Sequence, residues 1–302
     1  MALRRLRLVP RTALLMTPLG EQVTGQSGTA AAQLVGGSAY PNLPSGWTIL
    51  SDRDFLTKTD GGWTDRGDAA FTIQTTATDA MCSQYNRLTD STGRAAYNAG
   101  FNSGNGPIST SYNISSGNRR TGLYLRFNCA VSSNWYGESS GVNKIYFLPA
   151  GSSPAGPLYL SAQGATTGAL QFQPRLQNAP ASVFGNGTGG TRNLTANTGL
   201  GSATITRGVR FAAELVLRMN TCQADGTPNG DGTCEVWVNG VKTHDYSDVC
   251  YRGNGTLSNL IPASALWTEA RWNPTWGGNH VGETVPALQY MYMYDAAVGT
   301  GT

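Results

Sequence analysis

The residues of this sequence best suited to acid–base chemistry are its few glutamates. Retaining cleavage of a glycosidic bond uses two carboxyl groups about 5 to 5.5 Å apart. The pattern E-x-D-x-E on one strand supplies such a pair, because alternate residues share a face. None of the glutamates begins this pattern. Glu214, in an apolar run, and Glu269, between Trp267 and Trp272, are the best isolated candidates. The alternative, which the isolation of each acid favours, is a buried or rim acid held by hydrogen bonds.

A second chemistry, removal of a proton beside a carboxylate, needs a base and cations that neutralise the carboxylate. Tyrosine or histidine could serve as the base, which must reach the proton that it removes. Side chains suited to these roles stand at alternating positions: Tyr124 and Arg126, Lys144 and Tyr146, Gln171, Gln173 and Arg175. The same alternation is typical of the polar outer face of a sheet. Both interpretations therefore stay open.

The sequence predicts no cofactor and no metal site. His244 and His280 are the only histidines, and no C-x-x-C pair is present, so the spacing typical of zinc ligands is missing. The loop 225–235, "DGTPNGDGTCE", offers oxygen ligands, but the register that starts at Thr227 ends on valine where a calcium loop needs glutamate. We therefore predict a turn-rich hairpin loop there.

Two of the five cysteines are candidates for a disulfide. Cys222 and Cys234 flank the segment "QADGTPNGDGT" between two predicted strands, and hairpin geometry could bring them within bonding distance. We expect this bond if the protein matures outside a reducing cytosol; two reduced thiols are the alternative. The pairing of Cys82, Cys129 and Cys250 stays open, and the odd count leaves at least one thiol free or bonded to another chain.

Alternating aromatic residues near the end of the chain supply a signal for binding. In "QYMYMYDAAV", at 289–298, period two predicts Tyr290, Tyr292 and Tyr294 on one face of a strand. Met291 and Met293 then point between two sheets, where flexible side chains fill gaps. The tyrosines would form a strip that docks a sugar or a protein, unless both faces are covered.

Three tryptophans in "WTEARWNPTWGGNH" add to this signal. Sugar rings stack on tryptophan, although tryptophan also fills cores and interfaces. The candidate binding residues are Tyr290, Tyr292, Tyr294, Trp267, Trp272, Trp276, Tyr124, Arg126 and Lys144.

The elements that must position these residues are predicted to be many short strands. The chain has 302 residues with 39 glycines and only 13% charged residues, a composition typical of strands joined by turns. In "TGLYLRFNCAV", at 121–131, Leu123, Leu125 and Phe127 alternate with polar or aromatic residues. Asn239–Gly240 predicts a hairpin turn. The predicted fold class is all-β: a two-sheet antiparallel jelly-roll sandwich with an extended N-terminal arm.

The domain prediction divides the chain into three parts. Residues 1–45 are predicted to be a basic, Gly/Pro-rich arm or linker, 46–298 the sandwich, and 299–302 a tail. The arginines that precede Glu21 fit a solvated tail, an assembly arm or a secretory signal, although Pro18 breaks the apolar stretch that a signal needs. No run approaches the roughly 20 apolar residues of a membrane span. The net charge of +3 disfavours nucleic acid as the main ligand.

Four segments together resemble a known family. "GLYLRFNCAV", "AAELVLRMN", "CEVWVNGVKTHDY" and "LQYMYMYDAAV" follow one another in an order that resembles the concanavalin A-like lectin/glucanase sandwich, which includes laminin-G-like modules. The resemblance covers about residues 46–298 and is one of pattern, since none of the motifs is specific alone. "SSGVNKIYFLPA" and "WNPTWGG" also resemble stretches of uncharacterised sandwich proteins of phages and environmental bacteria.

The resemblance implies two stacked antiparallel sheets, one of them concave, with sugars bound on the concave face in those members that bind or cut them. The R-x-E-x-x-x-R and Q-x-H patterns of lyases with a similar fold are missing, which weakens the case for catalysis. Fold alone does not settle function.

The function predicted first is a non-catalytic structural or adhesion protein, a virion or surface component that binds a glycan or a neighbouring subunit through a sandwich face. The alternative is a secreted polysaccharide lyase or glycoside hydrolase of the same fold. The expected partners are other structural subunits or a polysaccharide, with a homo-oligomer as one form. The expected location is the virion, the cell surface or the extracellular space.

Overall fold

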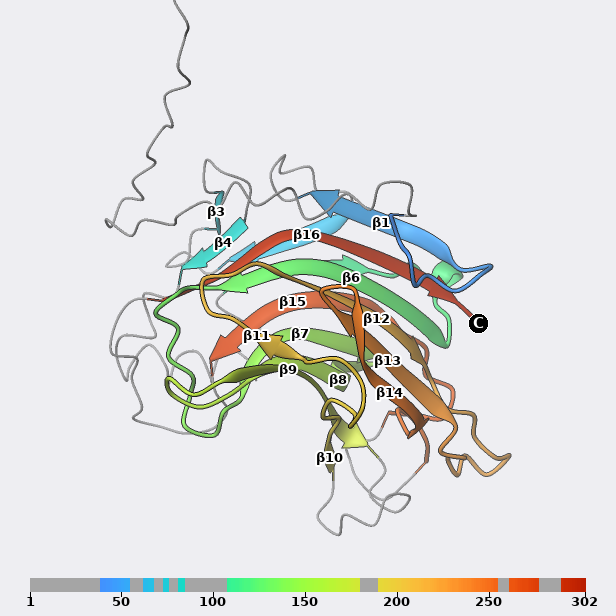
Figure 1. Cartoon of the computed structure of the whole chain (residues 1–302). Helices are drawn as coiled ribbons and strands as arrows, with labels where there is room; N and C mark the ends of the chain where they lie inside the picture. The colour runs from blue at the N-terminus through green and yellow to red at the C-terminus, as the bar shows by residue number, and fades with distance from the viewer. Residues whose placement is uncertain are drawn as a thin grey trace, which may run out of the picture. The chain divides into compact units, whose positions relative to one another are not determined.

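Two packed antiparallel β-sheets form the body of the protein (Figure 1). The computed structural model describes residues 39–54, 62–67, 73–75, 81–84, 108–179, 190–254, 261–276 and 289–302. Within these residues, sheet A contains β1 (Thr48–Asp54), β3 (Ile73–Thr75), β4 (Met81–Gln84), β6 (Gly122–Val131), β12 (Phe211–Arg218), β13 (Gly232–Val238), β14 (Val241–Val249) and β16 (Tyr290–Gly301). Sheet B contains β2 (Trp63–Gly67), β5 (Ile108–Asn113), β7 (Asn143–Ala150), β8 (Ser153–Gln163), β9 (Leu170–Ala179), β10 (Gly190–Asn193), β11 (Thr204–Ile205) and β15 (Glu269–Trp276).

The strand order joins segments that are distant in the sequence. Sheet A has the order β14-β13-β12-β6-β16-β4-β3, and β1 also pairs with β16. Sheet B has the order β10-β9-β8-β7-β15-β5-β2, and β11 also pairs with β9. A single short 3-10 turn, Ser116–Asn118, accompanies them in the described part of the chain. The predicted all-β sandwich is confirmed. None of the helices among these residues has the length and apolarity to cross a membrane.

The core between the sheets is built from alternate residues, as the sequence predicts. Leu123, Leu125 and Phe127 of β6 are fully buried in it. Met291 and Met293 of β16 are 1% and 0% exposed and belong to the same core. The predicted direction of the two methionines is therefore confirmed.

Both predicted ends of the sandwich domain differ from the structure. The compact unit that contains the sandwich begins at Asn42 and ends at Thr302. Asn42, in the predicted arm, donates its backbone N–H and its side-chain amide to Glu214, at 3.1 and 2.7 Å. The predicted tail 299–302 is wrong, because β16 keeps its pairing with β6 as far as Gly301. Residues 1–38 of the predicted arm lie outside the described residues.

The predicted bond between Cys222 and Cys234 is wrong. Both thiols are free. The hairpin register places Leu217 opposite Cys234, whereas Cys222 lies beyond β12 and opposite Pro228. Cys234 is buried in the core, so its side chain faces the opposite sheet and not the loop that contains Cys222.

A glycine with a left-handed backbone permits a bulge where β7 and β8 pair. Gly156 has φ +66°, and a Cβ there would lie 2.1 Å from the carbonyl oxygen of Leu148. The left-handed conformation alone costs other residues about 1–2 kcal/mol, and the clash with backbone adds to it. We expect Gly156→Ala to lower the free energy of unfolding by more than about 2 kcal/mol.

The matched control for this substitution is Gly46→Ala. Gly46 has φ +80° but nothing within 4 Å of the added Cβ, so only the conformational cost applies. Denaturant unfolding of the two variants measures the difference. Equal losses in the two variants would show that the close approach to Leu148 costs nothing.

His244 of β14 makes the stability depend on pH. It is 0% exposed, its Nδ1 lies 2.8 Å from the Thr243 hydroxyl, and its ring meets Phe172 edge-on. Burial lowers the pKa of His244 to about 4, from 6.5 in an exposed chain. The unfolded chain therefore binds a proton first as the pH falls. The stabilisation is complete above pH 6.5 and is lost as the pH falls towards 4, by at most roughly 3 kcal/mol.

We expect His244→Gln to flatten the dependence of unfolding free energy on pH between about 6.5 and 4. Urea unfolding at several pH values, for the native chain and the variant, measures the two slopes. Because the carboxylates titrate in both proteins, the difference between the slopes isolates His244. Identical slopes would contradict a buried, neutral histidine.

Candidate functional site

The outward face of sheet B carries cations, amides and aromatic rings close together. Figure 1 shows the strands of both sheets bowing in the same direction, with this face on the inner side of the curve. Val142, Phe147 and Tyr159 form a small apolar cluster there, separate from the main core. Lys144, Gln173 and Arg175 lie on the same face of the neighbouring strands.

Strand pairing aligns these side chains in two rows, because residues directly opposite each other on antiparallel strands share a face. In one row, Arg271 of β15 pairs with Phe147, Phe147 with Tyr159, and Tyr159 with Arg175 of β9. In the other row, Thr275 pairs with Lys144, Lys144 with Ser161, and Ser161 with Gln173. The first row ends in a guanidinium group on both sides, Arg271 and Arg175. The second row contains the amine of Lys144.

A shift of register creates this arrangement. Lys144 and Phe147 are three residues apart, so a regular strand would turn them to opposite faces. The pairing of β7 with β8 shifts between Lys144 and Tyr146. Phe147 therefore lies outside with Lys144, while Tyr146 is fully buried in the core, its hydroxyl 3.9 Å from the sulfur of Met293. Tyr146, a candidate base, is thus separated from this face.

Lys144 has the electrostatics of a base. Its Nζ lies 5.8 Å from the ring centre of Phe147 and 5.3 Å from that of Tyr159. Burial, and then the positive charge of Arg175, lower the pKa of Lys144 to about 8, and Glu138 acts in the opposite direction. In about a tenth of the molecules, the side chain of Lys144 is therefore a neutral amine at pH 7.

Tyr159 has the electrostatics of a proton donor. Burial raises its pKa, and the charge of Arg175 and a hydrogen bond with it oppose the rise. The Arg175 guanidinium carbon lies 5.9 Å from the centre of the ring. The phenol is therefore protonated at neutral pH and lies beside a cation.

Three polar atoms in this region are buried without a hydrogen-bond partner: Gln173 Oε1, Arg175 Nε and Asn273 Oδ1. Gln173 is 7% exposed and Asn273 is 5% exposed. Leaving such an atom unpaired costs about 1–3 kcal/mol. Gln173 and Arg175 offer an acceptor and a donor side by side, which suits a ligand with both hydroxyl and carboxylate groups.

The three predicted tryptophans do not belong to a binding platform. Trp267, Trp272 and Trp276 are 0%, 0% and 1% exposed, and all lie in the main core. Trp272 and Trp276 are four residues apart on β15, so period two places both on its inner face. Most of the tryptophan-containing segment is thus the strand β15, Glu269–Trp276.

The two isolated acids are also structural. Glu214 is 6% exposed and accepts hydrogen bonds from Asn42 and from the hydroxyl of Tyr124, at 2.5 Å. Tyr124 is therefore buried and engaged, which excludes it as an open binding residue. Glu269 accepts two bonds from Arg271, at 2.7 and 2.5 Å.

The remaining predicted residues lie on the outward face of sheet A. Tyr292 and Tyr294 are half-buried there, opposite in direction to the two methionines, and the Arg210 guanidinium carbon lies 4.4 Å from the ring centre of Tyr294. Arg126 shares this face, since it pairs with Glu214. The side chain of Tyr290 lies outside the described residues. The tyrosine strip and Lys144 therefore belong to different sheets.

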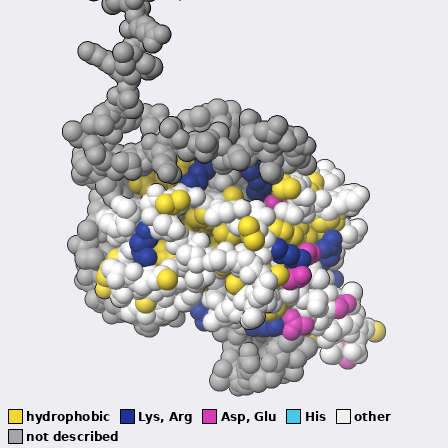
Figure 2. Space-filling model, in the orientation of Figure 1, with side chains coloured by type: hydrophobic (Ala, Val, Ile, Leu, Met, Phe, Trp, Pro, Cys, Tyr) yellow, Lys and Arg dark blue, Asp and Glu magenta, His cyan; other side chains and the backbone are white. Residues whose placement is uncertain are grey.

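Charges on sheet A neutralise one another. Glu235 lies 3.5 Å from Arg218 and 2.9 Å from Lys242, which also lies 2.9 Å from Asp245. Figure 2 shows basic and acidic side chains adjoining over β12–β14. On this part of sheet A, the basic side chains therefore have acidic partners at close range.

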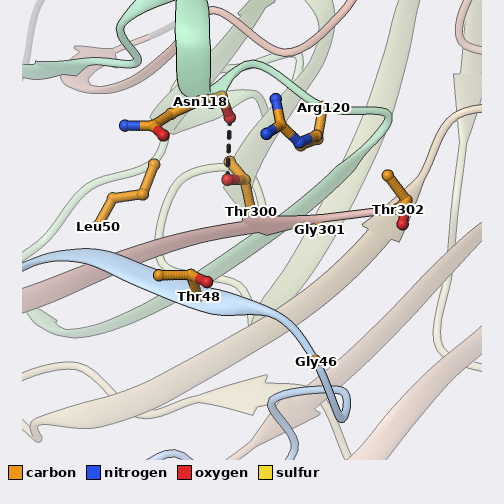
Figure 3. Close-up of a pocket in the computed structure, with 8 residues that line it drawn as sticks. All are labelled: Gly46, Thr48, Leu50, Asn118, Arg120, Thr300, Gly301 and Thr302. Atoms are coloured by element: carbon orange, nitrogen blue, oxygen red, sulfur yellow. Dashed lines mark hydrogen bonds between the residues drawn. The ribbon is translucent and has the colours of Figure 1, made fainter.

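A pocket at the end of sheet A is a poorer candidate. Figure 3 shows Arg120, Asn118 and Thr300 on one side and Thr48 and Leu50 on the other. The Thr300 hydroxyl donates to the Asn118 carbonyl at 3.0 Å, and Arg120 donates to two carbonyls of its own turn. Its lining residues include no acid–base pair.

The loop 225–235 shows no metal site. Asp231 accepts the backbone N–H and the hydroxyl of Thr221, both at 2.7 Å, and Asp225 accepts the N–H of Thr227. No group of three or more potential ligands occurs among the residues that the structure describes.

Sequence analysis missed Tyr159 and Asn273. A signal for Tyr159 exists, because in "GPLYLSAQG" it alternates with Leu158 and Leu160 and must face away from the core. Asn273 has no such signal, since it lies where the pairing of β15 with β7 is irregular.

Similarity to known proteins is limited to structure. No protein-family model matches the sequence, and no curated protein is significantly similar. The alginate lyase vAL-1 from Chlorella virus superposes with a TM-score of 0.55 and 15% identity, over 84% of this chain and 100% of that one. A mutant of the alginate lyase Aly36B, bound to an alginate trisaccharide, superposes with a TM-score of 0.53 and 15% identity, over 83% and 98%. At this identity the likeness establishes the sandwich fold, and the laminin-G-like family is not shown.

Proposed function

We propose that this protein is a polysaccharide lyase that cleaves an acidic polysaccharide on the outward face of sheet B. The observation that carries the proposal is the placement of Lys144, whose pKa is about 8, 5.3 Å from the ring centre of the protonated Tyr159. A base and an acid on neighbouring strands, with Arg175 beside them, are the groups that β-elimination next to a carboxylate requires.

In the proposed reaction, Arg175 and the amide of Gln173 hold the sugar unit that carries the carboxylate. The neutral amine of Lys144 takes the proton from C5, next to the carboxylate. The electron pair of that C–H bond forms the C4–C5 double bond, and the C4–O bond to the neighbouring sugar breaks. The leaving oxygen takes the proton of the Tyr159 hydroxyl, and exchange with solvent restores both side chains.

The similar structures support the lyase reading over the non-catalytic reading that the sequence favours. Both are lyases of alginate, which is a polymer of uronates. Their fold also hosts proteins that bind without cleavage, so the chemistry of Lys144 and Tyr159 has to carry the proposal. For a protein that acts on polysaccharide, we also propose a location outside the cell or on a virion.

A second candidate function is binding of the same polysaccharide without cleavage. The observation that favours it is the burial of Tyr159, which is only 4% exposed and bonded to Arg175. A buried phenol that is already bonded to Arg175 is poorly placed to give its proton to a leaving oxygen, whereas the cations and amides around it can still bind the polymer.

A panel of polysaccharides tests the two candidates. Polymers of mannuronate, guluronate and glucuronate are incubated with the protein, beside a neutral glucan. The proposal predicts ultraviolet absorbance from unsaturated uronate, rising in step with reducing ends, for at least one acidic polymer and not for the glucan. Binding without either signal would favour the second candidate, and reducing ends without the absorbance would exclude elimination.

A further inference from the structure

A fully buried asparagine lies between two residues of the site. Asn143, the first residue of β7, is 0% exposed, whereas its neighbours Val142 and Lys144 lie on the outward face of sheet B. This follows from the pleat of a strand, in which successive side chains point to opposite faces. Contacts that hold Asn143 inside the protein therefore also fix where its two outward neighbours lie.

Four hydrogen-bond contacts hold the side chain of Asn143. Its Nδ2 donates to the carbonyls of Gly141, Ala162 and Gly164, at 3.2, 2.8 and 3.0 Å. Its Oδ1 accepts the backbone N–H of Glu138 at 3.2 Å. Ala162 belongs to β8 and Gly164 follows that strand directly. One side chain thus joins the segment before β7, the start of β7 and the end of β8.

The pairing of β7 is irregular on both sides just after Asn143. The pairing with β8 shifts between Lys144 and Tyr146, and the pairing with β15 shifts between Trp272 and Thr275. Such shifts interrupt the regular ladder of backbone hydrogen bonds. The side-chain bonds of Asn143 to β8 lie immediately before the interruption, so they tie the two strands together where the ladder is weakest.

The place of Lys144 against two aromatic rings depends on this part of β7. Its Nζ lies 5.8 Å from the ring centre of Phe147 and 5.3 Å from that of Tyr159. Val142 packs with the same two rings in the small apolar cluster of this face. A movement of the backbone at Asn143 would withdraw Val142 and Lys144 from the rings together.

We propose that Asn143 is a positioning residue for the lyase reaction: its buried amide holds the start of β7 so that the amine of Lys144 stays beside the rings of Phe147 and Tyr159. The consequence for the reaction rests on the proposed function. The placement of Lys144 does not, and it can be measured without any substrate.

The direct test is NMR of Lys144 in the variant Asn143→Ala. The chain has three lysines, Lys58, Lys144 and Lys242, so labelling lysine with ¹³C at Cε gives three signals, and Lys144→Arg identifies one of them. Ring currents displace the Hε signals of Lys144 from their position in the unfolded chain. This displacement should be largely lost in Asn143→Ala, whereas that of Lys242, which lies over Trp237, should stay the same. Unchanged Lys144 signals would overturn the proposal.

The titration midpoint of Lys144 is a second readout of the same movement. Burial is the largest cause that lowers the pKa of Lys144 to about 8, ahead of the charge of Arg175, and Glu138 acts in the opposite direction. Release of the amine to solvent should therefore raise the midpoint by about one pH unit or more in Asn143→Ala. A midpoint that stays near 8 in the folded variant would contradict the positioning role.

Asn220→Ala is the matched control. Asn220 is also 0% exposed, and it lies after β12 of sheet A. Its side chain donates to the carbonyls of Thr221 and Arg252, at 3.0 and 2.9 Å, and accepts the backbone N–H groups of Tyr251 and Arg252, at 2.7 and 3.1 Å. This variant should lose stability and leave the signals and midpoint of Lys144 unchanged. Equal changes at Lys144 in both variants would show that general destabilisation causes them, which overturns the proposal.

A milder substitution covers the case in which Asn143→Ala does not fold. Asn143→Ser keeps a hydroxyl that can donate to one of the three carbonyls. The signals and the midpoint of Lys144 should then change in the same direction by a smaller amount. A folded Asn143→Ser variant with native Lys144 signals would contradict the positioning role.

Cleavage kinetics separate this proposal from the proposed function. Arg175 and Gln173, which hold the polymer in the proposed reaction, lie on β9, so KM should change little. A displaced base should lower kcat of Asn143→Ala by about 10- to 100-fold. Displaced Lys144 signals in a chain that cleaves no polysaccharide would refute the lyase function and leave the placement standing. Cleavage with the native kcat in Asn143→Ala would refute the positioning role.

Discussion

Replacing Lys144 with methionine will lower kcat/KM for cleavage of an acidic polysaccharide by about 10²- to 10⁴-fold. Methionine keeps the length of the side chain, so the neighbouring rings of Phe147 and Tyr159 retain their contacts. The variant lacks the amine that takes the C5 proton, and it also lacks a charge beside the bound carboxylate. Initial rates of unsaturated uronate formation, measured below saturation, give the ratio.

Lys242→Met is the control for this loss. Lys242 pairs with Glu235 and Asp245 on sheet A, away from the site. The kcat/KM of the Lys242→Met variant should equal that of the native chain. Retention of more than about a tenth of the activity in Lys144→Met, in a variant with unchanged melting, would remove Lys144 from the role of base.

Replacing Met293 with alanine will lower the free energy of unfolding by about 2–5 kcal/mol. Met293 is fully buried between the sheets, and its sulfur lies 3.9 Å from the hydroxyl of Tyr146. Truncation removes apolar contacts and leaves a cavity that packed neighbours fill only in part. Denaturant unfolding at neutral pH measures the loss.

Tyr292→Ala provides the comparison on the same strand. Tyr292 is half-buried on the outward face of sheet A, so its truncation opens no internal cavity, and we expect a smaller loss. A larger loss in Tyr292→Ala than in Met293→Ala would reverse the assigned faces of β16.

The alternation of residues predicted the fold because burial on one face of a strand leaves a period of two in the sequence. This holds for Leu123, Leu125 and Phe127, and again for Met291 and Met293. Alternation failed to identify Tyr124 as buried, because the outward face at that point is covered by Asn42 and Glu214. Contacts between residues that are so far apart in the sequence leave no periodic pattern in it.

The candidate site was predicted only in pieces. Lys144, Gln173 and Arg175 were identified by their chemistry, but the sequence does not state which strands are neighbours. Their assembly with Tyr159 depends on the order β7-β8-β9 and on the shift of register after Lys144. The prediction that the three tryptophans bind a ligand was wrong. Their chemistry suits a sugar, but their side chains are buried in the core.

The reaction products test the central claim most directly. A purified polyuronate oligosaccharide is treated with the native chain and with Lys144→Met, and the fragments are analysed by mass spectrometry. Elimination predicts that each cut by the native chain yields one saturated fragment and one that is lighter by one water and carries a C4–C5 double bond at its new non-reducing end, with almost none from Lys144→Met. Two saturated fragments per cut, which together have gained one water, or equal yields from both proteins, would contradict a lyase that works through Lys144.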